Sequence, residues 1–263
     1  MKLKFYKFTA AGNDFIIIDN RKRIIRKNIN GIVKKLCDRK FGIGADGLIL
    51  FENSKIAEFR MRYYNSDGSY ATMCGNGARC IARYAYITGL KKKKFVFETD
   101  AGLITAEIFS DSVKVKLYET QNMKLDLSLN IDKKTFRLSF INTGVPHTVI
   151  FVDNLEKVDV VNLGRKIRFH KKFSPDGTNV NFVKLINSHT ISIRTYERGV
   201  EDETLACGTG VTASAIISIL KNKVKSPVNC ITRSGIKFKV FYDMTDVYLQ
   251  GPADLVFSGE ILV

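Results

Sequence analysis

Alternating apolar and polar residues predict that short β-strands make up most of this chain. Residues 3–8 alternate in this way, and residues 15–18 form a second predicted strand after a polar turn. Three further short strands, at 95–98, 102–109 and 113–118, have the spacing of hairpins. Helical periodicity is confined to a few stretches, so the pattern indicates a mixed α/β (α+β) protein rich in strands.

Four stretches are predicted to be helices. Residues 28–37 and 162–169 have helical periodicity, and Asn28 is the expected N-cap of the first. Residues 78–87 and 211–220 are rich in apolar residues and are predicted to be buried helices, the first ended by Gly89. Each of these two buried helices directly follows a Cys-Gly-x-Gly sequence, at Cys74 and at Cys207.

The order of elements in the first half recurs in the second half. Predicted strands at 136–141, 148–152 and 191–196 repeat those before the first cysteine. Landmarks in the two halves are offset by 132 or 133 residues, namely Phe8 and Phe140, Gly12 and Gly144, Phe41 and Phe173, and Cys74 and Cys207. A constant offset over half the chain predicts two similar domains, 1–117 and 118–252, with 253–263 returning to the first.

Each predicted domain is a curved, mostly antiparallel β-sheet or barrel wrapped around one central helix. If two such domains pack face to face, the two cysteines are expected to oppose each other across a cleft between them. Ligand sites favour clefts between domains. The sequence therefore predicts an active site between the pseudo-symmetric halves.

Length and composition fit a protein of the cytoplasm. The 263 residues contain no apolar run near the ~18 that a membrane span needs. The first ten residues alternate like a strand and lack the apolar region of a signal peptide. The five cysteines are an odd number without framework spacing, which favours reduced thiols over disulfides.

The net charge of +16 raises the alternative of a nucleic-acid-binding protein. However, the basic residues are spread along the chain, and the one dense run, 91–94, follows a helix as a solvated loop would. This alternative explains neither the repeat nor the paired thiols. A basic surface can instead concentrate carboxylate substrates.

A cysteine at the entrance of a helix meets unpaired backbone N–H groups and the positive end of the helix dipole. This environment is expected to lower the pKa of both thiols and to bind an anion beside them. Zinc is not favoured, because Cys-x-x-Cys and nearby histidine spacings are missing from the sequence. A single nucleophilic cysteine with His147 leaves the second Cys-Gly-x-Gly unexplained. Racemisation or epimerisation, in which one thiolate removes a proton and the opposite thiol delivers one, uses both.

Six segments together resemble the diaminopimelate epimerase family: FTAAGNDF, FGIGADG, YYNSDGSYATMCGNGARC, TGVPH, DGTNVNF and YERGVEDETLACGTG. The Cys-Gly-x-Gly element alone is shared with proline racemases and phenazine-biosynthesis proteins. The resemblance implies cofactor-independent interconversion of LL- and meso-2,6-diaminopimelate, a small-molecule substrate, on the way to lysine and peptidoglycan. It is compatible with a homodimer. A racemase or epimerase of another amino acid is the alternative.

The resemblance also implies a role for individual residues. Cys74 and Cys207 would be the acid and base, and His147 and Glu197 would orient the reacting ammonium and assist the thiols. The distal end of the substrate would be held by Asn13, Asn65, Asn179 and Arg198. The reacting α-carboxylate would be bound by Gly75, Asn76, Gly208 and Thr209.

Three positions depart from the family pattern. Val145 replaces the usual asparagine before Pro-His, and Gly47 stands where some members have a substrate-contacting glutamine. The segment between Glu197 and Cys207 is one residue longer than its common form. These departures concern recognition of the distal end and leave the cysteine pair unchanged.

Overall fold

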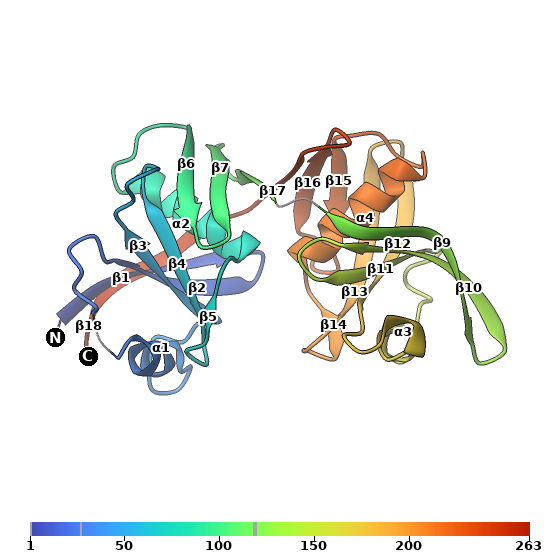
Figure 1. Cartoon of the computed structure of the whole chain (residues 1–263), viewed down its shortest axis with the longest axis horizontal. Helices are drawn as coiled ribbons and strands as arrows, with labels where there is room; N and C mark the ends of the chain where they lie inside the picture. The colour runs from blue at the N-terminus through green and yellow to red at the C-terminus, as the bar shows by residue number, and fades with distance from the viewer. Residues whose placement is uncertain (1, 27, 118–119) are drawn as a thin grey trace. The chain divides into compact units, whose positions relative to one another are not determined.

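The computed structural model describes residues 2–26, 28–117 and 120–263, shown in Figure 1. Met1, at the start of the first expected domain, and Tyr118, at a strand end and the domain boundary, lie outside the described residues. The chain forms two compact units: unit 1 is Met1–Lys116 with Gln250–Val263, and unit 2 is Leu117–Leu249. The chain thus returns to unit 1 at Gln250, where the sequence indicated residue 253.

Unit 1 is built from nine strands and two helices of the described residues. Its strands are β1 (Lys2–Ala10), β2 (Asn13–Asp19), β3 (Gly47–Glu52), β4 (Arg60–Asn65), β5 (Tyr70–Ala71), β6 (Lys94–Thr99), β7 (Gly102–Ile108), β8 (Val113–Lys116) and β18 (Asp254–Leu262). Its helices are α1 (Ile29–Cys37) and α2 (Gly75–Ile87).

From β10 (Lys134–Asn142) onward, unit 2 follows the order of elements in unit 1, with one additional 3-10 helix. Its strands are β9 (Gln121–Ile131), β10 (Lys134–Asn142), β11 (Pro146–Phe151), β12 (Asn179–Asn187), β13 (Thr190–Glu197), β14 (Asp202–Thr204), β15 (Val228–Ile231) and β16 (Lys237–Tyr242). Its helices are α3 (Val160–Arg168), the short 3-10 helix η1 (Lys171–Phe173) and α4 (Gly208–Leu220). Strand β17 (Val247–Gly251) runs from unit 2 into the returning segment.

Strand pairing confirms the internal repeat. In unit 1, β1 and β2 form an antiparallel hairpin, β2 pairs in parallel with β3 across α1, and β3 and β4 are antiparallel. In unit 2, β10 with β11, β11 with β12 across α3, and β12 with β13 pair in the same three ways. The edge partners also correspond, because β18 pairs with β1 and β9 pairs with β10, both antiparallel.

Each unit has one central helix with strands around it (Figure 1). Helix α2 contacts β1–β4, β7, β8 and β18, and α4 contacts β10–β13, β15 and β16. The residues of α4 are buried from Gly210 to Ser218, as its largely apolar sequence predicts. Helices α1 and α3 each pack with neighbouring strands in a further apolar cluster of their own unit. The expected sheet wrapped around a buried helix is therefore confirmed in both units.

Three local expectations were wrong. Asn28 precedes α1, but it adopts a left-handed conformation and its side chain caps no N–H, since side-chain capping requires an extended N-cap. The apolar, β-rich run at residues 56–64 predicts a strand over its whole length, but β4 begins at Arg60, because Ser54 Oγ accepts the N–H groups of Ile56 and Ala57 in a turn. Strand β9 was not predicted, although apolar residues alternate along it from Met123 to Ile131.

Candidate functional site: two cysteines at helix N-termini

Cys74 is the N-cap of α2, and Gly75 is the first residue of this helix. The backbone of Cys74 is extended, and its Sγ accepts the N–H of Gly77 at 3.4 Å. Helix α2 thus begins three residues before the apolar run that predicts it. The first-turn N–H groups at Gly75 and Asn76 have no partner within the helix, so they are available to an anion.

Two expected binding residues lie beside this thiol. Asn76 Nδ2 donates to Asn13 Oδ1 at 3.1 Å, and Cys74 Sγ lies 4.0 Å from the same oxygen. The other side of the Asn13 amide, Nδ2, donates to Asp46 Oδ2 at 2.7 Å. Because a carboxylate can only accept, this bond fixes which way the Asn13 amide points. We call Cys74, Gly75, Asn76 and Asn13 the first half-site.

An ion-pair network holds Asp46 in turn. Arg39 Nη2 lies 2.7 Å from Asp46 Oδ1 and 2.8 Å from Asp14 Oδ1, and Lys7 lies 2.7 Å from Asp14 Oδ2. Although burial acts in the opposite direction, hydrogen bonds from Arg39 and Lys7 hold the pKa of the Asp14 carboxyl below its ordinary value. The network sits behind Asn13 and keeps its amide oriented.

Arg79 was not selected from the sequence, yet it supports the first half-site. It is fully buried on α2, and its Nη2 donates to Asn76 Oδ1 at 2.6 Å. Burial lowers the pKa of this guanidinium to about 10, so it stays charged at neutral pH. The sequence has two arginines in this predicted buried helix, Arg79 and Arg83, and only Arg79 is buried in the structure.

Asn65 and Gly47 face each other at the ends of their strands, since Gly47 of β3 pairs with Asn65 of β4. The side chain of Asn65 donates to Ser69 Oγ at 3.0 Å, as a turn residue often does. A Cβ at Gly47 would lie 2.5 Å from a ring carbon of Tyr63 and 2.6 Å from Tyr64 O. A glutamine at this position would therefore require both the Tyr63 ring and the backbone at Tyr64 to move.

Cys207 occupies the corresponding position in unit 2, as the N-cap of α4. It is 9 % exposed, and its Sγ lies 3.4 Å from Thr209 Oγ1. Gly208 and Thr209 begin the helix, and Thr209 O accepts the hydroxyl of Thr143 at 3.1 Å. We call Cys207, Gly208 and Thr209, with the neighbouring His147 and Glu197, the second half-site.

The expected lowering of both thiol pKa values was wrong. Burial raises the pKa of Cys207 to about 12, and the carboxylate of Glu197 acts in the same direction. Burial also raises the pKa of Cys74, while the N–H groups of Gly77 and Asn76 and the charge of Arg79 oppose it. Removing a thiolate from water costs more free energy than the N–H groups and dipole of the helix N-terminus contribute in stabilising it.

The charged groups near the two sulfurs differ. The cation of Arg79 favours a thiolate at Cys74 and the carboxylate of Asp46 opposes it to a smaller extent, whereas the carboxylate of Glu197 disfavours a thiolate at Cys207. Burial in turn raises the pKa of the Glu197 carboxyl. The two half-sites share a backbone plan but differ in that only the first has a cation acting on its sulfur.

The side chain of Asn179 links the backbone at Pro146 to the backbone at Arg198. Its Nδ2 donates to Pro146 O at 2.9 Å, and its Oδ1 accepts the N–H of Arg198 at 2.8 Å. Asn179 also pairs with His147 across the parallel strands β11 and β12. Arg198 Nη1 donates to Asp176 O at 3.2 Å. Both ends of the Asn179 amide are thus engaged by the backbone.

His147 is fully buried, and the buried Asn181 of β12 lies against it. Asn181 Nδ2 is 3.1 Å from His147 Nδ1. Burial, together with the charge of Arg198, lowers the pKa of His147 to about 3. The ring is therefore neutral near neutral pH. Asn181 was missed, although an asparagine in a predicted buried strand was a signal for a polar role.

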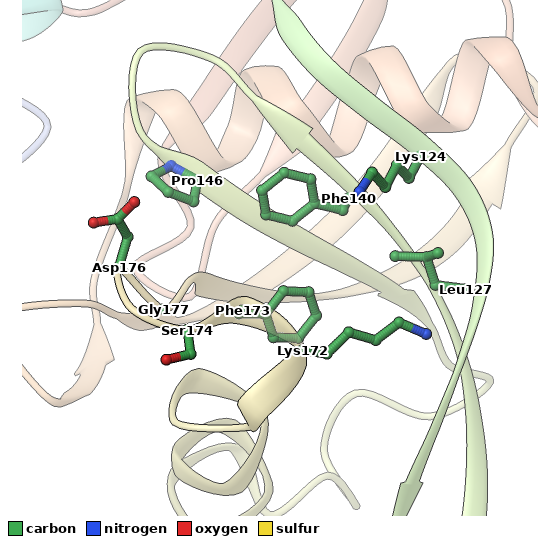
Figure 2. A pocket seen from close by; sticks show the side chains of 9 residues that line it. All are labelled: Lys124, Leu127, Phe140, Pro146, Lys172, Phe173, Ser174, Asp176 and Gly177. Carbon is green, nitrogen blue, oxygen red and sulfur yellow. The ribbon is translucent and has the colours of Figure 1, made fainter.

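A pocket of about 200 Å³ lies among β9, β10, Pro146 and the segment 172–177 (Figure 2). Phe140 and Phe173 stack in it with their ring centroids 5.8 Å apart. The residues that line it include Pro146 and Asp176, whose backbone carbonyls accept hydrogen bonds from Asn179 and Arg198. The pocket is thus connected to these two expected binding residues through hydrogen bonds, but none of the expected site residues lines it.

Within residues 2–26, 28–117 and 120–263, three or more His, Cys, Asp or Glu side chains do not gather where they could hold a metal ion. The described helices are all too short or too polar to cross a lipid bilayer.

Known proteins similar to this chain agree on one family. The sequence profile described as diaminopimelate epimerase matches residues 5–125 and 139–256. A diaminopimelate epimerase of Aquifex aeolicus is 47 % identical over 272 residues, which cover 98 % of each chain. One from Flavobacterium psychrophilum is 45 % identical over 98 % of this chain and 100 % of its own.

Solved structures show the same fold at low sequence identity. A phenazine biosynthesis protein of the PhzF family from Bacillus anthracis has a TM-score of 0.73 and 17 % identity, with 100 % of both chains covered. A hydroxyproline epimerase from Agrobacterium vitis has a TM-score of 0.69 and 13 % identity over 99 % of this chain and 92 % of its own. Together with the near-full-length matches of sequence, these findings show that the chain belongs to the diaminopimelate epimerase family.

Proposed function

We propose that this protein interconverts LL- and meso-2,6-diaminopimelate without pyridoxal or another cofactor. Relatives named diaminopimelate epimerase match this chain along nearly its whole length. The observation that carries the proposal is that each unit has a cysteine as the N-cap of its central helix. A mechanism with one acid and one base needs two such groups.

The reaction inverts one α-carbon. One thiolate removes the α-hydrogen as a proton, which leaves a carbanion beside the α-carboxylate. The other thiol then delivers its proton to the opposite face of the same carbon. Both cysteines change protonation state in every turnover, and a cysteine starts as base in one direction and as acid in the other. The proposal requires Cys74 and Cys207 to approach the same substrate carbon.

The two helix N-termini supply the stabilisation that this carbanion needs. The N–H groups of the first helical turns, at Gly75 and Asn76 and at Gly208 and Thr209, donate to the α-carboxylate as negative charge spreads onto it. Each helix adds the equivalent of about half a positive charge at its N-terminus. These donors are fixed by the backbone, so they need no rearrangement during the reaction.

The charges around the sulfurs support one assignment of the resting state. Arg79 favours the thiolate form of Cys74, and Glu197 favours the thiol form of Cys207. We therefore propose that the form with Cys74 as thiolate and Cys207 as thiol predominates in the free enzyme, and that the reaction in the other direction starts from the opposite protonation state. The raised pKa of both thiols keeps the thiolate a strong base once it forms.

Recognition of the distal end rests on Asn13, Asn65, Asn179 and Arg198. In this assignment the guanidinium of Arg198 binds the distal carboxylate, and Asn179 positions the backbone of Arg198. Val145 offers no side-chain donor at the position where the family usually has an asparagine. The free thiols, and a role in lysine and peptidoglycan precursor synthesis, fit a cytoplasmic enzyme.

The test of this function is direct. Purified protein is incubated with LL-diaminopimelate, and the stereoisomers are separated on a chiral column. We expect meso product to form without added pyridoxal phosphate, and L-lysine and L-proline to remain unchanged. Racemisation of L-proline or L-lysine at a comparable kcat/KM, with no turnover of diaminopimelate, would support the alternative of another amino-acid racemase.

A further inference from the structure

The imidazole of His147 has one nitrogen with a partner and one without. Nδ1 lies 3.1 Å from Asn181 Nδ2. Nε2 is buried, and within the described part of the chain it has no hydrogen-bond partner. A buried polar atom without a partner costs free energy, so such an atom in a functional unit indicates a ligand that completes it.

The orientation of the Asn181 amide follows from its other contacts. Nδ2 donates to the backbone carbonyl of Thr148 at 3.0 Å. A carbonyl can only accept, so the NH₂ group of Asn181 must be on this side. Its oxygen, Oδ1, accepts the hydroxyl of Thr195 at 3.0 Å on the other side. The amide cannot be reversed without breaking the bond to Thr148.

This orientation determines the tautomer of His147. The second hydrogen of Asn181 Nδ2 points at His147 Nδ1, which must therefore accept. A neutral imidazole has one donor and one acceptor nitrogen, so the proton is on Nε2. Because the ring is neutral, it presents an N–H donor at its unpartnered nitrogen.

We propose that Asn181 is a positioning residue that holds His147 as an Nε2–H donor, and that this donor binds a carboxylate oxygen of the substrate. The second part rests on the proposed function. An ammonium group offers only donors, so it cannot bond to this nitrogen. In this proposal His147 binds a carboxylate of the substrate and not the reacting ammonium. Glu197 alone then orients the ammonium.

Asn181 also connects His147 to the first turn of α4. A Cβ placed on Gly210 would lie 2.3 Å from Asn181 Oδ1 and 3.4 Å from Cys207 Cβ. Glycine at this position lets the helix start against the amide. The buried side chain of Asn181 thus determines the tautomer of His147 and also contacts the helix turn that follows Cys207.

The tautomer can be measured without any activity assay. The chain has only three histidines, so ¹⁵N-histidine labelling gives few signals, and loss of one set in His147→Gln assigns His147. Long-range ¹⁵N–¹H correlation spectra of the wild-type protein at pH 7.5 should show a neutral ring protonated at Nε2. A ring protonated at Nδ1, or at both nitrogens, would overturn the proposal.

Asn181→Asp is the matched variant, because it keeps the shape but replaces the NH₂ donor by an acceptor. The carboxylate should draw the proton to Nδ1 and leave Nε2 as an acceptor. We expect kcat to fall about a hundredfold, with a smaller change in KM. Asn187→Asp makes the same change at the exposed end of the same strand, and should leave the His147 spectrum and kcat unchanged.

These readouts separate the two proposals. If the wild-type ring has the Nε2–H tautomer but diaminopimelate is not turned over, the tautomer assignment stands and the proposed function fails. If diaminopimelate is turned over while the Asn181→Asp spectrum keeps the proton on Nε2, the positioning role fails. If Asn181→Asp does not fold, the wild-type spectrum alone decides the assignment.

Discussion

Replacing either Cys74 or Cys207 by alanine is expected to abolish epimerisation in both directions. Every turnover uses one sulfur as base and the other as acid, so a single remaining thiol cannot invert the carbon. Positioned acid and base groups each contribute about 10²- to 10⁴-fold to a rate, and we expect a loss of at least about 10³-fold for either variant. The measurement is kcat from the LL and from the meso substrate.

The control for this prediction is Cys80→Ala, which removes a buried thiol from the same helix, α2, away from its N-terminus. This variant should keep activity within a fewfold of the wild type. Substantial turnover by Cys207→Ala in either direction would contradict the two-base mechanism and leave an enzyme that uses Cys74 alone.

Acid should destabilise the folded protein through His147. The pKa of this group falls from 6.5 to about 3 on folding because the ring is buried. Between these values the unfolded chain binds a proton that the folded protein does not. The free energy of unfolding should therefore decrease as the pH falls below 6.5, with a slope from this group of about 1.4 kcal/mol per pH unit. Above that range the contribution is fully present.

Urea unfolding at several pH values between 7.5 and 4.5, compared with His147→Gln, measures this contribution. The variant is less stable at pH 7.5, but its stability should fall less steeply with acid, so the two curves converge. Parallel curves would show that His147 takes up its proton equally well in the folded protein. The Asp14 carboxyl, whose pKa is lowered on folding, adds to acid sensitivity only at lower pH and equally in both proteins.

Local sequence patterns predicted the repeated architecture because they reflect local physical causes. The largely apolar stretches at 78–87 and 211–220 predicted buried helices, and the glycines beside Cys74 and Cys207 indicated where they begin. The constant offset between halves predicted that the pairing order of unit 1 would recur in unit 2. Strand β9 alternates clearly from Met123 to Ile131 and could have been found in the same way.

The supporting side chains of the two half-sites could not be predicted from such patterns. Arg79 reaches Asn76 from within one helix turn, but its role depends on the burial of its guanidinium. Asn181 acts through contacts with residues of other strands. The thiol pKa values depend on how far the folded chain removes each sulfur from water, and this outweighs the helix dipole that the sequence does indicate.

The most direct test of the two-base mechanism is hydrogen exchange during early turnover of LL-diaminopimelate in D₂O, followed by NMR and mass spectrometry. The incoming proton comes from a thiol that has equilibrated with solvent, on the face opposite to the one deprotonated. The account predicts meso product with one deuterium at the inverted centre, a protiated distal centre, and recovered LL substrate that is unlabelled. Recovered LL substrate that gains deuterium as fast as product forms would show that one base serves both faces, and would contradict the account.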